Sequence, residues 1–104
     1  MTRYEVVFEN SFANDVTSML LYEMHVLGSY EKACERLDHL LDMISDDLST
    51  FPERNPERHY GYTQIPRRVH SLGRYLVIYW VDHRAGKVRV ERIIHQRSRE
   101  TQDA

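Results

Sequence analysis

Arginine, histidine and tyrosine gather in the last third of the chain, and together they could bind or act on an anionic group. The residues concerned are Arg67, Arg68, Arg74, Tyr75, Arg92, His95, Arg97 and Arg99. Arginine carries a planar set of donors that fits a phosphate or carboxylate at two points and stays charged at any relevant pH. Tyrosine can stack on a nucleobase, and histidine can transfer a proton near neutral pH. This cluster predicts either a surface for an anionic partner or a site for acid–base chemistry.

Sequence motifs for metals, nucleotides and covalent catalysis are absent. There is no HExxH, His-x-His or CxxC pattern for a metal, and neither GxxxxGK[ST] nor GxGxxG for a nucleotide. There is no GxSxG, and the single cysteine, Cys34, falls within a predicted helix, where we expect it to be a small buried residue. We therefore expect no cofactor and no metal. Most of the six histidines are expected to be solvated.

Charge is divided unevenly between the two halves of the chain. The formal net charge is −2, but residues 1–50 hold three basic and ten acidic residues, whereas residues 51–104 hold eleven basic and six acidic ones. The total excludes a protein coated with positive charge. The basic half points to an anionic partner for that part of the molecule. Alternatively, the acidic helices neutralise the basic strands within the fold.

The length favours one domain that spans residues 1–104. The composition is 41% hydrophobic, which is enough to build a core. No apolar run approaches the roughly 18–20 residues that a membrane span needs, and the first residues do not resemble a signal peptide. We expect a cytoplasmic protein without a membrane partner.

The first half of the chain predicts a strand and two helices. Residues 3–9 alternate, with Tyr4, Val6 and Phe8 on one face, which indicates a strand with one buried face. Ser11 is the expected N-cap of a helix that ends at Gly28. Its apolar stripe consists of Phe12, Val16, Met19, Leu20 and Leu27, and its polar positions away from the stripe include Asp15 and Glu23.

The second helix has the clearest pattern in the chain. Its apolar stripe consists of Ala33, Leu37, Leu40, Leu41, Ile44, Leu48 and Phe51. Its opposite side consists of Glu31, Glu35, Asp38, Asp42 and Asp46. Ser29 can cap the start of this helix, and Pro52 marks its end. The short connection predicts an antiparallel helical hairpin with an acidic outer face.

The second half predicts a loop followed by three strands. Residues 52–66 form the loop, residues 67–70 a short strand, and residues 75–81 a strand that is apolar on both sides, as in a strand covered on both faces. Residues 82–86 form a hairpin turn, and Lys87 to His95 return as the last strand. The expected fold is α+β in the order β-α-α-β-β-β, with the helical hairpin packed on a mostly antiparallel sheet.

Alternation along the last strand divides its residues between two faces. One face would consist of Val88, Val90, Arg92 and Ile94, and the other of Arg89, Glu91, Ile93 and His95. Arg92 would then lie on the apolar side. There it could belong to a binding site, or it could simply pair with a nearby carboxylate such as Asp82 or Glu91.

The chain resembles the RelE/ParE superfamily, the toxins of bacterial type II toxin–antitoxin systems. The resemblance covers almost the whole chain and is most specific in residues 66–69 (PRRV), 73–81 (GRYLVIYWV) and 88–96 (VRVERIIHQ). It implies a microbial-RNase-like α+β fold, in agreement with the pattern above. It also implies a partner, a cognate antitoxin whose partly disordered segment wraps the toxin. The superfamily contains both mRNA endonucleases of the RelE branch and DNA gyrase inhibitors of the ParE branch.

Three features make the chain more similar to the ParE branch. Both helices are long, the end of the last strand resembles ParE closings, and no Tyr or Lys follows His95. The negative net charge also suits a ribosome binder poorly. This resemblance implies a gyrase inhibitor without catalysis. The residues expected to bind the target are Arg67, Arg68, Tyr75, Arg92, His95, Arg97 and Arg99.

The RelE branch implies the alternative function, a ribosome-dependent and metal-independent mRNA endonuclease. Such an enzyme needs a base for the 2′-hydroxyl, an acid for the leaving oxygen and cations for the phosphorane. Glu91 or His95 would be the base or the acid, and Arg74 and Arg92 would hold the phosphate. An inactive toxin kept as a partner of its antitoxin is a third reading, for which the chain offers no direct sign.

Overall fold

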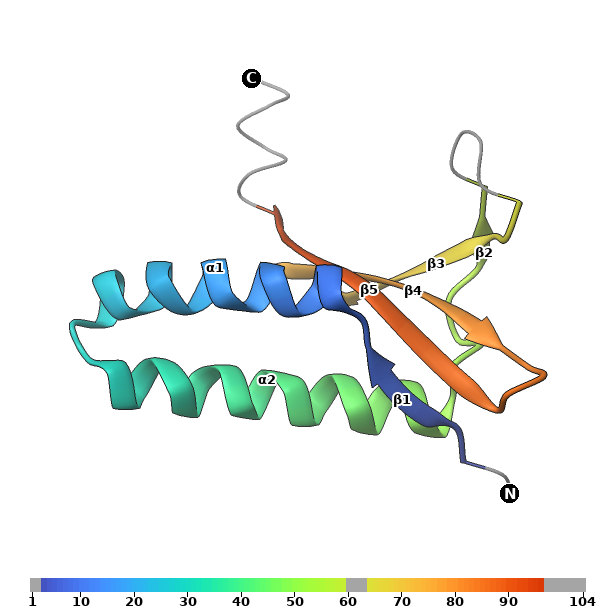
Figure 1. Cartoon of the computed structure of the whole chain (residues 1–104), viewed down its shortest axis with the longest axis horizontal. Helices are drawn as coiled ribbons and strands as arrows, with labels where there is room; N and C mark the ends of the chain where they lie inside the picture. Colours follow the sequence, from blue (N-terminus) through green and yellow to red (C-terminus); the bar gives the residue numbers. More distant parts are fainter. Residues whose placement is uncertain (1–2, 60–63, 97–104) are drawn as a thin grey trace.

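The first and last strands lie side by side, although they come from opposite ends of the sequence (Figure 1). The structure, a computed structural model, describes residues 3–59 and 64–96. Strand β1 (Glu5–Phe8) runs parallel to β5 (Lys87–His95), with Val6 opposite Val88 and Phe8 opposite Val90. The predicted strand over residues 3–9 is confirmed with shorter bounds, and its expected apolar side packs against the core.

The sheet has five strands in the order β1-β5-β4-β3-β2. The remaining strands are β2 (Glu57–Arg58), β3 (Arg67–Leu72) and β4 (Tyr75–Asp82), and every pair except β1–β5 is antiparallel. The predicted mostly antiparallel α+β fold is confirmed. The loop expected over residues 52–66 was wrong in part, because β2 lies within it and pairs with the start of β3. Two residues are too short a strand to show any alternation.

Helices α1 (Asn10–Leu27) and α2 (Tyr30–Thr50) form the predicted antiparallel hairpin, which lies against one face of the sheet (Figure 1). Gly28 ends α1 with φ 66°, a left-handed conformation that favours glycine. The Ser29 hydroxyl accepts a hydrogen bond from the Lys32 amide, as expected of an N-cap. Ser11 as the cap of α1 was wrong. The helix begins at Asn10 with Glu9 at the N-cap position, two residues earlier than expected, and the Ser11 hydroxyl donates to the Glu91 carbonyl at 2.6 Å.

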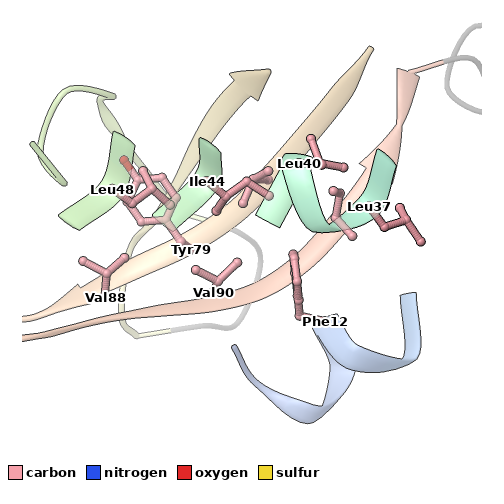
Figure 2. Packing of buried hydrophobic residues seen from close by; sticks show 10 residues of the cluster. Phe12, Leu37, Leu40, Ile44, Leu48, Tyr79, Val88 and Val90 are labelled. Atoms are coloured by element: carbon pink, nitrogen blue, oxygen red, sulfur yellow. The ribbon is translucent and has the colours of Figure 1, made fainter. Parts of the chain in front are cut away.

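The core lies between the helical hairpin and strands β4 and β5 (Figure 2). Side chains of α2 point toward β4 and β5, and Phe12 enters from α1. The most buried members are Phe12, Ile44, Leu48, Val77, Tyr79, Val88 and Val90. The apolar stripe of α2 is confirmed except for Phe51, which follows the helix as its C-cap and is 56% exposed. Cys34 is half-buried.

Strand β4 has one face under the helices and one face covered by the sheet's own side chains. Val77 and Tyr79 are fully buried on the first face. Trp80 points to the other face, where the guanidinium carbons of Arg67 and Arg89 each lie 5.8 Å from its ring centre. The strand was expected to be covered on both faces. The helices cover one face, and on the other the arginine side chains lie against the Trp80 ring.

Candidate functional site

Tyr75, Arg92 and His95, three of the predicted site residues, line one cleft between α1 and the end of β5. The cleft has a volume of about 590 Å³. Its walls consist of Asp15, Ser18, Met19, Tyr22 and Glu23 from α1, Tyr75 from β4, and Arg92, Ile93, Ile94 and His95 from β5. The rings of Tyr75 and His95 meet edge to face, with centres 5.1 Å apart. The topology thus brings the ends of two strands against one helix.

A β-bulge at Glu91 decides which side chains reach the cleft. Tyr79 of β4 pairs with Val90, but the preceding Ile78 pairs with Arg92, so Glu91 has no partner across the strand. The predicted alternation over residues 87–95 was therefore wrong beyond Val90. Ile93 becomes a core residue at 4% exposure, although alternation placed it away from Val88 and Val90.

The bulge also separates Glu91 from Arg92. The Glu91 carboxylate pairs with Arg67, with 2.5 Å between Oε1 and Nε and 3.3 Å between Oε2 and Nη2. Arg67 lies beside Trp80, on the face away from the helices. The four residues Arg74, Glu91, Arg92 and His95 expected of a nuclease are therefore not brought together in one site.

Arg92 is held by a carboxylate of α1. Asp15 accepts from Arg92 Nε at 2.8 Å and from Nη2 at 3.1 Å, and it also accepts from the Ile93 amide at 3.0 Å. These hydrogen bonds raise the pKa of Arg92 above its usual range. The expected pairing of Arg92 with a carboxylate is confirmed, but the partner is Asp15 rather than Asp82 or Glu91.

Glu23 is a buried carboxylate at the inner end of the cleft, and the sequence analysis placed it wrongly. It is 6% exposed and accepts from the Tyr75 hydroxyl and from Arg36 Nη1, both at 3.3 Å. Burial, and then the neighbouring Glu23 charge, raise the pKa of Tyr75, so this hydroxyl keeps its proton. A signal was present in the sequence, because Glu23 follows Leu20 by three residues and precedes Leu27 by four, which puts it on the apolar stripe.

A second hollow of about 390 Å³ adjoins the cleft, between the helical hairpin and the turn that joins β3 to β4. Glu23, Tyr75 and His95 line both hollows. Arg36 and Arg74 stand in the lining of the second one, together with the apolar side chains of Val26, Leu40, Met43 and Leu72. Arg74 is thus near Tyr75 and His95, but on the other side of Glu23 from Arg92.

Arg68 belongs to a different environment from the cleft. Its side chain is 11% exposed, its Nη1 donates to the Asn55 carbonyl, and its Nη2 lies 3.0 Å from the Glu57 carboxylate. Arg68 therefore fastens the segment before β3 to the sheet. Arg97 and Arg99, also predicted to bind the target, lie outside the described residues.

A buried polar network, which the sequence analysis missed, joins the end of α2 to the sheet. His70 is 7% exposed; its Nε2 lies 3.0 Å from Asp47 Oδ2, and its Nδ1 lies 3.1 Å from Asn55 Nδ2. A neutral imidazole satisfies both contacts, with Nε2–H donating to Asp47 and Nδ1 accepting from Asn55. The Tyr79 hydroxyl donates to the Pro52 carbonyl at 2.6 Å and accepts from Asn55. His70 thus has a structural role.

No group of three or more His, Cys, Asp or Glu side chains within residues 3–59 and 64–96 is arranged to hold a metal ion. No helix of the same ranges is long and apolar enough to cross a membrane. The polar groups that line the cleft are two carboxylates, two tyrosines, a serine, a histidine and an arginine that is already paired.

Similarity to known proteins is found at the level of structure. No protein-family profile matches the sequence, and no curated protein matches it. A chain in the crystal structure of the toxin–antitoxin complex RelBE2 from Mycobacterium tuberculosis has a similar fold, with a TM-score of 0.63 and 18% sequence identity. The match covers 91% of this chain and 93% of that chain. At this identity the similarity establishes the fold alone.

Proposed function

We propose that this chain is the toxin of a bacterial toxin–antitoxin pair, held inactive by a cognate antitoxin. The support is a fold that matches a chain of the RelBE2 toxin–antitoxin complex over nearly the full length of both. The strand residues that resemble the RelE/ParE superfamily, 73–81 and 88–96, are the ones that form the centre of the sheet and one wall of the cleft. Such a toxin acts in the cytoplasm.

We further propose that it arrests growth by binding a protein, DNA gyrase, rather than by cutting RNA. The observation that carries this proposal is the pairing of four arginines of strands β3 and β5 with carboxylates of the same chain. Arg67 pairs with Glu91, Arg68 with Glu57, Arg89 with Asp82 and Glu9, and Arg92 with Asp15. Binding to ribosomal RNA gains its affinity from cations that neutralise phosphates. Cations already neutralised within the fold supply little of that affinity, whereas a protein target can be bound through a smaller mixed surface.

Two assays with the purified chain test this proposal. In a gyrase supercoiling assay the chain should block supercoiling, and in a coupled translation assay it should leave ribosome-bound mRNA intact. Ribosome-dependent cuts in mRNA without loss of supercoiling would contradict the gyrase target. Addition of the antitoxin encoded beside this chain should restore supercoiling, and a chain that is inert in both assays and in growing cells would contradict the toxin function itself.

One observation favours the mRNA endonuclease as a second candidate. Glu23, Tyr75, Arg92 and His95 line a single cleft, and a carboxylate and an imidazole beside an arginine are the groups that metal-independent RNA cleavage uses. In this reading Glu23 takes the place expected of Glu91. Substitution of Glu23 by Gln would then abolish mRNA cutting in the translation assay.

A further inference from the structure

Glu23 is a buried carboxylate to which the proposed inhibition of gyrase gives no role. It lies on α1 at 6% exposure, and it lines both the cleft and the second hollow. An ionised carboxylate that has left water is costly to hold unless a cation or several donors compensate its charge. The partners of Glu23 therefore decide what else this site can take.

Glu23 is contacted by the Tyr75 hydroxyl and by the Arg36 guanidinium, and of these two groups only Arg36 carries a charge. The Tyr75 hydroxyl donates at 3.3 Å, but a phenol is neutral and brings no positive charge. Arg36 Nη1 lies 3.3 Å from Glu23 Oε2, and the Arg36 side chain is 61% exposed, so water and salt screen this ion pair.

The other groups of the cleft define the kind of cation that fits. Asp15, the second carboxylate, is already bound to the Arg92 guanidinium and the Ile93 amide. Met19, Ile93 and Ile94 supply apolar side chains to the lining of the same cleft. A group with an aliphatic stem and a cationic head matches this lining, and lysine and arginine side chains have that form.

The surface around the cleft indicates what carries the cation. Leu21, Tyr22 and Val26 of α1 are 63%, 51% and 56% exposed. Together they make an apolar margin, and Tyr22 and Val26 line the hollows on either side of Glu23. A protein segment with apolar residues next to a basic one would cover this margin and place its cation in the cleft.

We propose that the cleft binds a lysine or arginine side chain from a segment of the antitoxin, with Glu23 as its acceptor. The head of that side chain replaces Arg36 at Glu23, and its stem packs on Met19 and Ile93. The identity of the protein that carries the segment rests on the proposed function. The chemistry of the site rests on the residues of the cleft.

A pair of short peptides tests the site directly. The probes are acetyl-Leu-Arg-Leu-amide and the same peptide with citrulline, which has nearly the same shape and no charge. Amide NMR shifts of Met19, Ile93 and Ile94 in the full chain report binding. The arginine peptide should shift these signals and bind about tenfold more tightly than the citrulline peptide, as expected for a hydrogen-bonded charge.

Substitutions at Glu23 and Arg36 should change this affinity in opposite directions. Glu23→Gln keeps an acceptor for Tyr75 but removes the charge, and it should weaken the arginine peptide about tenfold. Arg36→Gln removes the competing cation from an exposed position and should tighten the peptide severalfold. The matched controls are Asp46→Asn and Arg3→Gln, which remove the same charges from a surface pair whose side chains are 83% and 66% exposed. Neither control should alter binding.

Three results would overturn the proposal. They are equal binding of the citrulline peptide, a Glu23→Gln chain that binds as well as the parent, and an Arg36→Gln chain that does not bind more tightly. If Glu23→Gln fails to fold, the affinity of the Arg36→Gln chain for the arginine peptide still tests the proposal. Because the peptide assay does not depend on growth arrest, a chain that binds the peptide but never arrests growth contradicts the toxin function and leaves the cation site standing.

Discussion

Arg92 and His95 line the cleft from the end of β5, and their removal tests the proposed target surface most directly. Arg92→Ala and His95→Gln should each relieve growth arrest in cells that express the chain. Truncation of an interface residue of this kind costs more than about 1 kcal/mol of binding, so affinity for gyrase should fall at least about fivefold. Colony formation and the dose that inhibits supercoiling measure the effect.

The fold should survive both substitutions. The Arg92–Asp15 pair is half-exposed, with side-chain exposures of 52% and 18%, and its loss should cost about 1 kcal/mol or less. Arg84→Ala is a matched control, because Arg84 is exposed at the β4–β5 turn, away from the cleft. Full growth arrest by both cleft variants would show that the target binds elsewhere.

The hydrogen bonds of the Tyr79 hydroxyl allow a prediction about the stability of the fold and its pH dependence. Tyr79→Phe leaves the Pro52 carbonyl without its 2.6 Å donor, so the free energy of unfolding should fall by about 1–3 kcal/mol. Burial raises the pKa of Tyr79 above its ordinary value. Its contribution is therefore fully present below about pH 10, the unfolded pKa, and is lost as the pH rises through the folded pKa.

Urea unfolding at neutral and alkaline pH measures both effects. The Tyr79→Phe chain should be less stable than the parent near pH 7 and should lose less stability than the parent above pH 10. Parallel pH curves for Tyr79→Phe and the parent would contradict the role of this hydroxyl.

Single residues were the least predictable level of the structure. The sequence pattern named Tyr75, Arg92 and His95, and the fold does place them on one cleft. It missed the burial of Glu23 and His70, because a charged or titratable residue is assigned to the surface unless its partner is known. The partners, Tyr75 and Asp47, come from other elements, and pairing over such a distance has no signal in one sequence.

At the level of elements, the bulge at Glu91 allows a sharper prediction. Deletion of Glu91 should restore plain alternation, keep Ile93 in the core, and move Arg92 into the position that Glu91 holds opposite Arg67. Arg92 would then leave Asp15 and the cleft. The deleted chain should fold, with a free energy of unfolding lower by about 2 kcal/mol, and should no longer arrest growth.

Glu91→Ala separates the two consequences of that deletion. It removes the ion pair with Arg67, and so should cost a similar part of the stability, but it keeps the extra residue that aims Arg92 at the cleft. This variant should still arrest growth. Thermal unfolding measures the stability of the two variants, and colony formation measures their growth arrest. Equal growth arrest by both would show that the bulge does not determine whether Arg92 reaches the cleft.

Elements with long patterns were predicted well, and short or irregular ones were not. The last strand has the bounds expected from its sequence, Lys87 to His95, and the stripe of α2 is the buried one. Strand β2 and the bulge were not predicted, because two paired residues and one inserted residue are shorter than any period that a sequence can display. The pairing of β1 with β5 depends on the whole topology and had no local signal.

For the whole molecule, the internal pairing of arginines predicts weak, nearly salt-independent binding to nucleic acid. The affinity for a single-stranded oligonucleotide should change with salt as if no more than about two phosphates were contacted. Fluorescence anisotropy at several salt concentrations gives this slope. A steep dependence in the parent chain would contradict the preference for a protein target.

A double variant tests whether the arginine–carboxylate ion pairs are the cause of the weak salt dependence. Asp15→Asn and Glu91→Gln together release Arg92 and Arg67 from their carboxylates. The slope of log affinity against log salt should then steepen by about one unit or more. Asp42→Asn with Glu35→Gln changes the net charge equally on the exposed side of α2 and should leave the slope closer to that of the parent.

The place of β5 in the sheet has a consequence for the time at which the chain becomes active during synthesis. The strand made last lies between β1, made first, and β4, and it supplies Val88, Val90 and Ile93 to the core. The sheet and its core therefore cannot close until the whole stretch from β1 to β5 has emerged from the ribosome. At ordinary elongation rates that takes about 5–20 s, a delay during which the nascent chain cannot present the assembled cleft to any target.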